Sequence, residues 1–334
     1  MLFEFKKILN HAVQCQASSI KCVLASVVDL DGSSYRKPGV RMLITDKGDT
    51  VGAVSGGCVE KEVIRQAQQV LEDGLPRIMT YDGRYRLGCE GVLYILIEPF
   101  SLSDELLASW AEVLESRLSF EMHAFYSKEI GQSPDYGTII KLKGKEFTFR
   151  KDFSPSHNVS VFSQTMQPAL RLVIIGTEHD AVQMAMIGSS SGMEVTVVSS
   201  LKDARQKSDF PGADKVIALE PDGIDNLGLD EQTAVILMTH SYSRDFHYAL
   251  AILDQAYCYF GIIGSSRRKH MLFDELLQYN AELDLDKLES ISSPAGLNIG
   301  SVTPQEIAIS VIAEIIAVVR KKQSSKVINS ITVN

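Results

Sequence analysis

The sequence predicts an α/β protein with two domains: a mixed α+β domain, followed by a Rossmann-like, doubly wound domain built on a parallel sheet. The chain has 334 residues, which is about twice the ~150 residues of an ordinary domain. The pattern also changes along the chain. Strands separated by Gly-rich loops come first, and short apolar runs alternating with helical segments follow. We place the domains at residues 1–165 and 166–334.

The first domain is expected to hold a core of strands, loops and helices in residues up to about 118, followed by a short β-rich segment and a linker. Its helices are predicted from apolar residues at helical spacing, and its strands from β-branched runs bounded by Gly and Pro. The helices cover 2–16, 59–73 and 103–117, and the strands cover 21–28, 40–44, 50–54 and 92–97. Short strands follow from 120 to about 163, and the polar, Pro-containing segment 154–167 is interpreted as the linker.

The second domain is predicted from alternating strands and helices. The strands cover 171–176, 194–200, 214–219, 233–239 and 258–264, and helices cover 180–191 and 244–255. A last helix opens with Thr303, Pro304 and Glu306, a capping box with Pro at its first position. Its run from 307 to 319 is apolar nearly all round, so we expect it to be buried in the domain or against a second subunit.

Charge and composition exclude several classes of protein. The chain carries 33 basic and 42 acidic side chains, a net charge of −9, so it offers no sequence-wide positive field for nucleic acid. The N-terminus lacks the apolar core of a signal peptide, and the longest apolar run is shorter than the roughly 20 residues that cross a bilayer. We therefore expect a cytoplasmic protein that does not enter the membrane. The five cysteines include no CxxC pair and fit neither a disulfide framework nor a zinc site.

Two cysteines in Gly-rich turns are the first candidates for chemistry. Cys58 follows Gly56 and Gly57 at the predicted start of a helix, where the helix dipole and free N–H groups stabilise a thiolate. The alternative is that Cys58 is a small core residue after a turn. Cys89 lies in Gly-Cys-Glu-Gly, directly before a predicted buried strand. Their separation of 31 residues permits, but does not require, a shared site for a soft ligand.

A third candidate is the loop 32–41, Gly-Ser-Ser-Tyr-Arg-Lys-Pro-Gly-Val-Arg. Its two serine hydroxyls, three cations and flexible glycines suit a phosphate or an oxygen-rich heterocycle, which arginine binds through two parallel N–H groups. The alternative is a solvated hairpin loop. Because these cations cluster in an otherwise acidic chain, the sequence favours a binding role for the loop.

The second domain offers candidates at the carboxyl ends of its strands, where doubly wound sheets bind ligands. Gly176 begins the first turn, but the dinucleotide fingerprint GxGxxG is absent. Glu178 takes the position of the second glycine of the fingerprint, which lets the pyrophosphate approach the backbone closely. The acidic residue that binds the ribose after the second strand is also missing. NAD(P) is therefore not the expected ligand. His179, His240 and Arg267 could converge at this edge, and the alternative is that they are solvated.

Taken together, these segments resemble the xanthine dehydrogenase accessory protein family (XdhC/CoxI), and the resemblance covers nearly the whole chain. In the N-terminal half it is carried by 32–42, 55–60 and 88–91. In the C-terminal half it is carried by Gly176, His179, Ala181, Thr-His-Ser at 239–241, Gly-Ser-Ser-Arg-Arg at 264–268 and the segment 292–317. The chain departs from the family at the glycine-rich turn, which is Gly-Thr-Glu-His instead of Gly-Ala-Gly-His.

The resemblance implies an accessory protein rather than an enzyme. Such a protein binds molybdenum cofactor (molybdopterin) and protects it while a cysteine desulfurase helps to install the sulfido ligand. It then delivers the cofactor to apo xanthine dehydrogenase or a related molybdenum hydroxylase. By this resemblance, Cys58 contacts the molybdenum or the sulfur, Cys89 is a second cofactor contact, and Ser33, Arg36 and Arg41 contact the pterin phosphate. A homodimer is expected. Two alternatives stay open: an NAD(P)-binding oxidoreductase, and a paralogue that acts only as an interaction scaffold or regulator.

Overall fold

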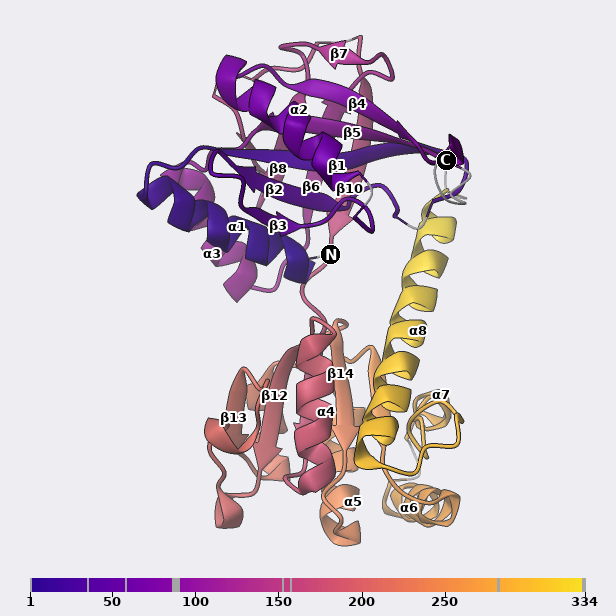
Figure 1. Ribbon diagram of the computed structural model, residues 1–334. Helices are drawn as coiled ribbons and strands as arrows, with labels where there is room; N and C mark the ends of the chain where they lie inside the picture. Colours follow the sequence, from indigo (N-terminus) through magenta and orange to yellow (C-terminus); the bar gives the residue numbers. More distant parts are fainter. Residues whose placement is uncertain are drawn as a thin grey trace. The chain divides into compact units, whose positions relative to one another are not determined.

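The computed structural model describes residues 2–34, 36–57, 59–85, 91–151, 153–156, 158–280 and 283–331, and for Tyr85, Ser266 and residues 322–331 only the backbone. The chain divides into two compact units, Met1–Pro168 and Ala169–Asn334 (Figure 1). Each unit has its own sheets and its own hydrophobic core.

The N-terminal unit is built on a six-stranded sheet. Its strands are β1 (Cys22–Asp31), β2 (Arg41–Thr45), β3 (Thr50–Gly52), β4 (Arg77–Asp82), β5 (Val92–Pro99) and β7 (Gly131–Gln132), in the order β3-β2-β1-β5-β4-β7. Every neighbouring pair in this order is antiparallel. Four of the strands agree with the predicted ones, β7 lies in the segment 120–163 where short strands were expected, and β4 is additional.

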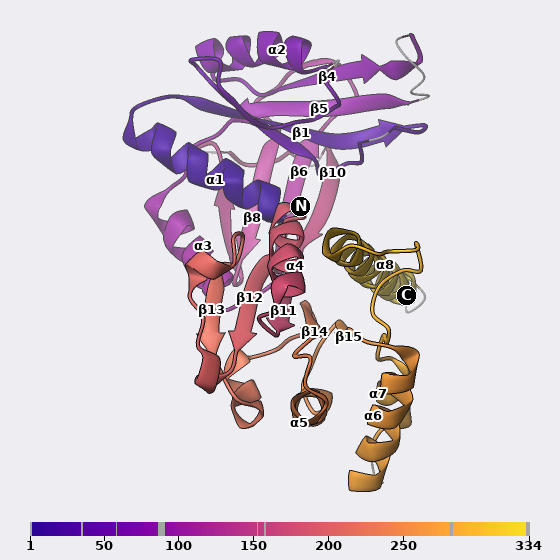
Figure 2. The ribbon, with the colours of Figure 1, turned by 60° about the horizontal axis from the view of Figure 1, so that its bottom comes forward.

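This sheet is covered on both faces (Figure 2). On one face, helix α2 (Glu60–Asp73) packs Val63, Ala67 and Val70 against alternate residues of β1, such as Ala25. Because successive side chains of a strand point to opposite faces, the intervening residues of β1, such as Val28, pack against a second sheet. Burial on both faces explains why β1 is apolar at nearly every position. Helix α1 (Leu2–Ala17) packs near β2 and β3.

The second sheet has four strands and corrects one prediction. Its strands are β6 (Phe120–Tyr126), β8 (Gly137–Leu142), β9 (Lys145–Thr148) and β10 (Ser160–Met166), in the order β10-β6-β8-β9, and helix α3 (Asp104–Glu115) precedes them. The segment 154–167 is therefore not simply a linker, because β10 pairs with the whole of β6. As an edge strand with one exposed face, β10 tolerates the polar residues that suggested a linker.

The C-terminal unit is a doubly wound domain, as the sequence predicts. Its strands are β11 (Arg171–Ile175), β12 (Glu194–Ser199), β13 (Lys215–Ala218), β14 (Thr233–Leu237) and β15 (Tyr259–Ile262), in the order β13-β12-β11-β14-β15. All neighbouring pairs are parallel. Helices α4 (His179–Ser190) and α8 (Pro304–Ile331) cover one face, and α5 (Tyr242–Leu253), α6 (Ser266–Tyr279) and α7 (Leu285–Glu289) cover the other.

Helix α8 begins with the predicted capping box. The Thr303 hydroxyl accepts a hydrogen bond from the Glu306 N–H at 3.3 Å, and the Glu306 carboxylate accepts one from the Thr303 N–H at 3.0 Å. The helix packs Val311 and Ile315 into the core of its own unit. Ile309, on another side of the helix, is 51% exposed. The unit therefore buries only one side of α8. Among the described residues, no helix combines the length and the hydropathy needed to cross a bilayer.

Candidate functional site

The described residues of the three N-terminal motif segments lie at one end of the six-stranded sheet. Strand β1 ends at Asp31, where it pairs with Val92, the first residue of β5. Strand β3 ends at Gly52, which pairs with Met42 near the start of β2. The loop 32–40, the turn 53–59 and Gly91 of the Gly-Cys-Glu-Gly segment therefore leave the sheet at the same end, which we call the motif end.

Two of these segments touch each other. A Cβ atom on Gly91 would lie 2.6 Å from the carbonyl oxygen of Ser33, so only glycine permits this contact without a shift of the backbone. Gly32 has φ of +88°, a conformation that also favours glycine. The start of the loop at Ser33 and Gly91 are thus packed against each other.

The turn before α2 is held by its own side chains. Glu60 accepts hydrogen bonds from the Ser55 N–H at 2.8 Å and the Ser55 hydroxyl at 2.6 Å, and from the Val59 N–H at 3.2 Å. Burial opposes ionisation of Glu60, but these hydrogen bonds outweigh it and lower its pKa. Apart from the chain neighbours of each glycine, no atom of the described residues lies within 4 Å of a Cβ built on Gly56 or Gly57, so open space lies in front of the turn.

Cys58 and Cys89 themselves lie outside the described residues, so their assignment as cofactor or molybdenum contacts stays a prediction. The residues that flank them are described. Val59 is fully buried at the start of α2, and Gly91 contacts Ser33. In the part of the chain that the structure describes, no group of three or more His, Cys, Asp or Glu side chains is placed to hold a metal ion.

The three polar candidates of the loop 32–41 differ in exposure. Ser33 is exposed and Arg36 is half-buried. Arg41 is buried, and its Nη1 donates hydrogen bonds to the carbonyl of Gly39 and to Oε1 of Gln164, both at 2.8 Å. Burial lowers the pKa of Arg41 to about 10, although the negative charge of Glu98 acts to raise it. In this structure Arg41 ties the loop to β10, and its contact with a phosphate stays a prediction.

A polar cluster at the root of this loop was not predicted from the sequence. Lys128 lies 2.7 Å from a carboxylate oxygen of Asp31 and 3.2 Å from one of Asp29. The hydroxyls of Tyr94 and Tyr126 donate to Asp31 and Asp29, both at 2.8 Å. The alternation Asp29-Leu30-Asp31 before Gly32 could have indicated two carboxylates on one face of the strand end. Lys128 lies about a hundred positions away in sequence, so no local pattern links it to the aspartates.

The hydrogen bond from Lys128 lowers the pKa of Asp31, with Tyr94 acting in the same direction. Burial opposes ionisation of Asp29, but its hydrogen bonds with Tyr126, the Leu30 N–H and Lys128 lower its pKa as well. Both carboxylates are therefore ionised at neutral pH. They place hydrogen-bond acceptors at the motif end, suited to the N–H groups of a heterocycle.

In the C-terminal unit, the turn after β11 is tightly constrained. Gly176 has φ of +142°, and a Cβ atom there would lie 2.3 Å from the carbonyl oxygen of Met238. Glu178 is the N-cap of α4 without a side-chain capping bond, and both Glu178 and His179 are exposed. A carboxylate at this helix start repels a phosphate group, which is the physical reason for not expecting NAD(P).

The other two candidates at this edge are also exposed. His240 follows β14 with φ of +56°, a strained conformation for a residue with a side chain, and Arg267 lies on the first turn of α6. The structure describes no bond that joins His179, His240 and Arg267. Their convergence on a ligand stays a prediction.

The neighbour of Arg267 makes the contact that sequence reasoning missed. Arg268 forms an ion pair with the buried carboxylate of Asp245 at 2.5 Å. The same carboxylate accepts hydrogen bonds from the N–H and the hydroxyl of Thr239, at 3.3 and 2.5 Å. This network joins the end of β14 to α5 and α6. Gly264 makes room for it, because a Cβ there would lie 2.9 Å from Cδ of Arg268.

Comparisons with known proteins agree with this architecture. A family model described as "XdhC Rossmann domain" matches residues 172–315, and one described as "XdhC and CoxI family" matches residues 15–82. A Bacillus subtilis protein, named as a probable xanthine dehydrogenase subunit, is 27% identical over 318 residues, covering 89% of this chain and 92% of the relative.

Two further relatives cover nearly the whole chain. The Escherichia coli protein "Molybdenum cofactor insertion chaperone PaoD" is 24% identical over 322 residues, covering 94% of this chain and 89% of the relative. A crystal structure from Bacillus halodurans, described as a xanthine dehydrogenase, matches with a TM-score of 0.78 at 27% identity. That match covers 94% of this chain and 96% of the other.

Proposed function

Because the chain belongs to the XdhC and CoxI family, we propose that it binds molybdenum cofactor and inserts it into apo xanthine dehydrogenase or a related molybdenum hydroxylase. The observation that carries the proposal is the motif end of the six-stranded sheet. There the loop 32–40, the turn 53–59 and Gly91 leave the sheet together. One relative is named as a chaperone for insertion of this cofactor, which supports the same conclusion.

The chemistry of the motif end suits this cargo. The pterin carries a phosphate, for which the Ser33 hydroxyl and the Arg36 guanidinium supply hydrogen-bond donors. It also carries N–H edges, for which the ionised Asp31 supplies an acceptor. Molybdenum binds soft ligands such as thiolates. Cys58, two residues before α2 begins at Glu60, is the proposed contact to the metal or its sulfur, with Cys89 as the second.

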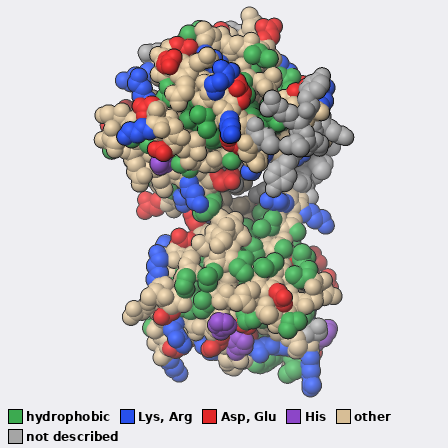
Figure 3. Space-filling view, viewed as in Figure 1, with side chains coloured by type: hydrophobic (Ala, Val, Ile, Leu, Met, Phe, Trp, Pro, Cys, Tyr) green, Lys and Arg blue, Asp and Glu red, His purple; other side chains and the backbone are tan. Residues whose placement is uncertain are grey.

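The proposal includes partner proteins. A cysteine desulfurase would supply the sulfur of the sulfido ligand, and the apo-hydroxylase would receive the finished cofactor. We also propose a homodimer formed through α4 and α8. Hydrophobic side chains gather on the face that these helices present (Figure 3), with Met186 42% and Ile309 51% exposed. Ile309→Asp should halve the mass of the particle in light scattering. An unchanged mass would exclude this face as the interface.

The binding proposal is tested on the full chain, purified from a host that makes the cofactor and assayed for molybdenum and for pterin. We expect both in the wild-type protein. Arg36→Ala should lower the bound cofactor by about tenfold or more, since one hydrogen bond to a charged group contributes roughly 1.5–3 kcal/mol. Cys58→Ala, which removes the proposed thiolate contact to the metal or its sulfur, should also lower the bound cofactor.

Two matched variants control for nonspecific damage. Cys258→Ala removes a buried cysteine of the C-terminal unit, and Arg65→Ala removes an exposed arginine that pairs with Glu62 on α2. Both should keep the bound cofactor of the wild type. Absence of molybdenum and pterin from the wild-type protein, or equal amounts in Cys58→Ala, would contradict the proposal.

A further inference from the structure

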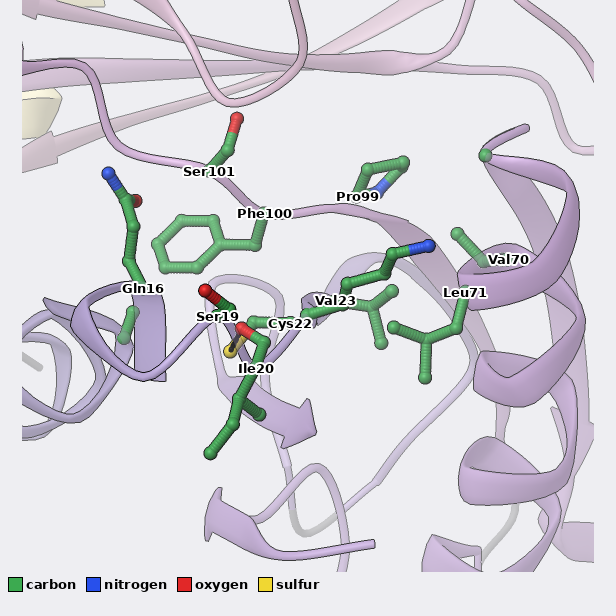
Figure 4. Close-up of a pocket in the computed structure, with 13 residues that line it drawn as sticks. Gln16, Ser19, Ile20, Cys22, Val23, Val70, Leu71, Pro99, Phe100 and Ser101 are labelled. Atoms are coloured by element: carbon green, nitrogen blue, oxygen red, sulfur yellow. Dashed lines mark hydrogen bonds between the residues drawn. The ribbon is translucent and has the colours of Figure 1, made fainter. Parts of the chain in front are cut away.

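A pocket lies at the opposite end of the six-stranded sheet from the motif end. At this end β1 begins at Cys22 and β5 finishes at Pro99, and the N–H of Phe100 donates to the carbonyl of Cys22 at 2.9 Å. The pocket has a volume of about 400 Å³, which is within the range of small-molecule sites. The end of α1, the start of β1, the end of α2 and residues 99–101 line it (Figure 4).

The C-terminal cap of α1 brings two cysteines together beside this pocket. Ser19 has φ of +55°, and the N–H groups of Ser19 and Ile20 donate to the carbonyls of Gln16 and Cys15, at 3.1 and 2.9 Å. This is a Schellman motif with Ser in the position that Gly usually takes. It reverses the chain over a few residues, so that Cys22 returns to the helical turn that carries Cys15.

The two thiols are in contact but differ in access. Cys15 and Cys22 are 4% and 8% exposed, and their side chains lie within hydrogen-bonding reach of each other. The Sγ of Cys22 also lies 3.9 Å from the carbonyl oxygen of Ile20. Cys22 is among the residues that line the pocket, as Figure 4 shows, whereas Cys15 is not. A small molecule in the pocket therefore meets Cys22 first.

We propose that Cys15 and Cys22 are a dithiol that a small disulfide entering the pocket oxidises to an intrachain disulfide. Cys22 loses its proton and attacks one sulfur of the reagent. A bond to Cys22 forms, the S–S bond of the reagent breaks, and the departing half takes up the proton as a thiol. Cys15 then loses its proton and attacks Sγ of Cys22, which releases the second half as a thiol. Two protein thiols are oxidised by two electrons, and the reagent is reduced to two thiols.

The burial of Cys22 sets the rate of the first step. Burial raises the pKa of Cys22 to about 12, and the adjacent Cys15 and the charge of Asp46 act in the same direction. Because the thiolate is the nucleophile, the reaction is slow at neutral pH and accelerates as the pH rises. The disulfide joins the end of α1 to the start of β1 beside the pocket. It is at the other end of the sheet from the proposed cofactor site, so either proposal can fail alone.

The probe for this proposal is oxidised glutathione, added to the full chain after reduction. Cys58→Ser and Cys89→Ser are included to remove the thiols outside the described residues. Trypsin cleaves after Lys7, Lys21 and Arg36, so Cys15 and Cys22 fall on the separate peptides 8–21 and 22–36. Mass spectrometry should find these two peptides joined by a disulfide, and reduction should separate them.

Single variants distinguish the two steps. With Cys15→Ser the reaction should stop after the first step, leaving one glutathione on Cys22. With Cys22→Ser, Cys15 should stay unmodified. Cys258→Ser, in the C-terminal unit, should leave the joined peptides unchanged. Free thiols on both peptides after prolonged exposure at raised pH would overturn the proposal, and so would glutathione on Cys15 in the Cys22→Ser protein.

Discussion

The two ends of the six-stranded sheet are made in different ways. At the motif end, loops rich in glycine and hydroxyl groups leave four strands together, and Asp29, Asp31 and Lys128 form a charged cluster at their root. At the other end, a helix cap and apolar side chains line a pocket that includes Cys22, and Cys15 lies beside Cys22 outside the lining. Strand β1 belongs to both ends, since it begins at Cys22 and finishes at Asp31. The residue types in the loops of the motif end indicate a binding site. The residue types in the helix cap at the pocket end give no such indication.

Two buried ionisable side chains, Arg41 and Glu98, lie between the two ends. Arg41 belongs to the motif end, and Glu98 precedes Pro99 at the pocket end. They are paired with Ser26 and Leu24 of β1, two residues apart, so their side chains lie on the same face of the sheet. Glu98 accepts hydrogen bonds from the Thr138 hydroxyl at 2.5 Å and from its N–H at 2.9 Å. Glu98 therefore also fastens this sheet to β8 of the second sheet.

The largest expected effect comes from the titration of Glu98. Burial raises its pKa from the usual 4.5 to about 7, although Thr138 and the charges of Arg41 and Arg150 act against this. The folded chain holds this proton more tightly than the unfolded chain. The stabilisation is therefore complete below pH 4.5 and is lost as the pH rises through about 7. The shift amounts to roughly 3 kcal/mol of unfolding free energy.

Urea unfolding at pH 5 and pH 8 measures this effect. Between these values the wild-type chain should lose about 2–3 kcal/mol more stability than Glu98→Gln, which cannot ionise. Glu112→Gln is the matched control, because Glu112 is exposed and pairs with Lys143, and its loss should leave the pH dependence unchanged. Parallel pH profiles for the wild type and Glu98→Gln would show that Glu98 does not titrate in this range.

The motif end is probed by two glycines in different surroundings. Gly91→Ala places a Cβ 2.6 Å from the Ser33 carbonyl oxygen, so the two segments must separate, at a cost of about 1–3 kcal/mol. In Gly56→Ala the new Cβ meets none of the described residues beyond its chain neighbours within 4 Å, and the stability should change by less than about 0.5 kcal/mol. Urea unfolding of both variants measures the difference. Equal stabilities would mean that the contact between the loop and Gly91 does not hold the motif end together.

Much of the fold could be predicted from the sequence, because the burial of each strand is visible in its residues. The apolar runs of the C-terminal unit identified its parallel strands, and the capping box at Thr303 identified the start of α8. Strand β10 was missed because it is an edge strand with polar residues on its open face. Strand β4 was missed because three of its six residues, Arg77, Thr80 and Asp82, are polar.

The candidate sites could be predicted only in part, because they depend on contacts between distant residues. The composition of the loop 32–41 indicated a binding segment, but not that Arg41 turns inward to Gln164. Two adjacent arginines follow Ser266, and only packing decides that Arg268 reaches Asp245 while Arg267 is exposed. The contact of Cys15 with Cys22 depends on the left-handed Ser19, which the sequence did not indicate because Gly usually takes that position.

The smallest expected effect concerns the cap that forms the pocket end. Ser19→Gly should raise the stability by about 0.5–1 kcal/mol, because glycine adopts the left-handed conformation without the strain that a Cβ imposes. The neighbouring Ser18→Gly is the control and should lower the stability slightly, since Ser18 does not have positive φ and glycine only adds freedom to the unfolded chain. Urea unfolding of both variants measures the two shifts. If Ser19→Gly instead destabilised the chain as Ser18→Gly does, α1 would not end in a Schellman motif, and the contact between the two thiols would lose its structural basis.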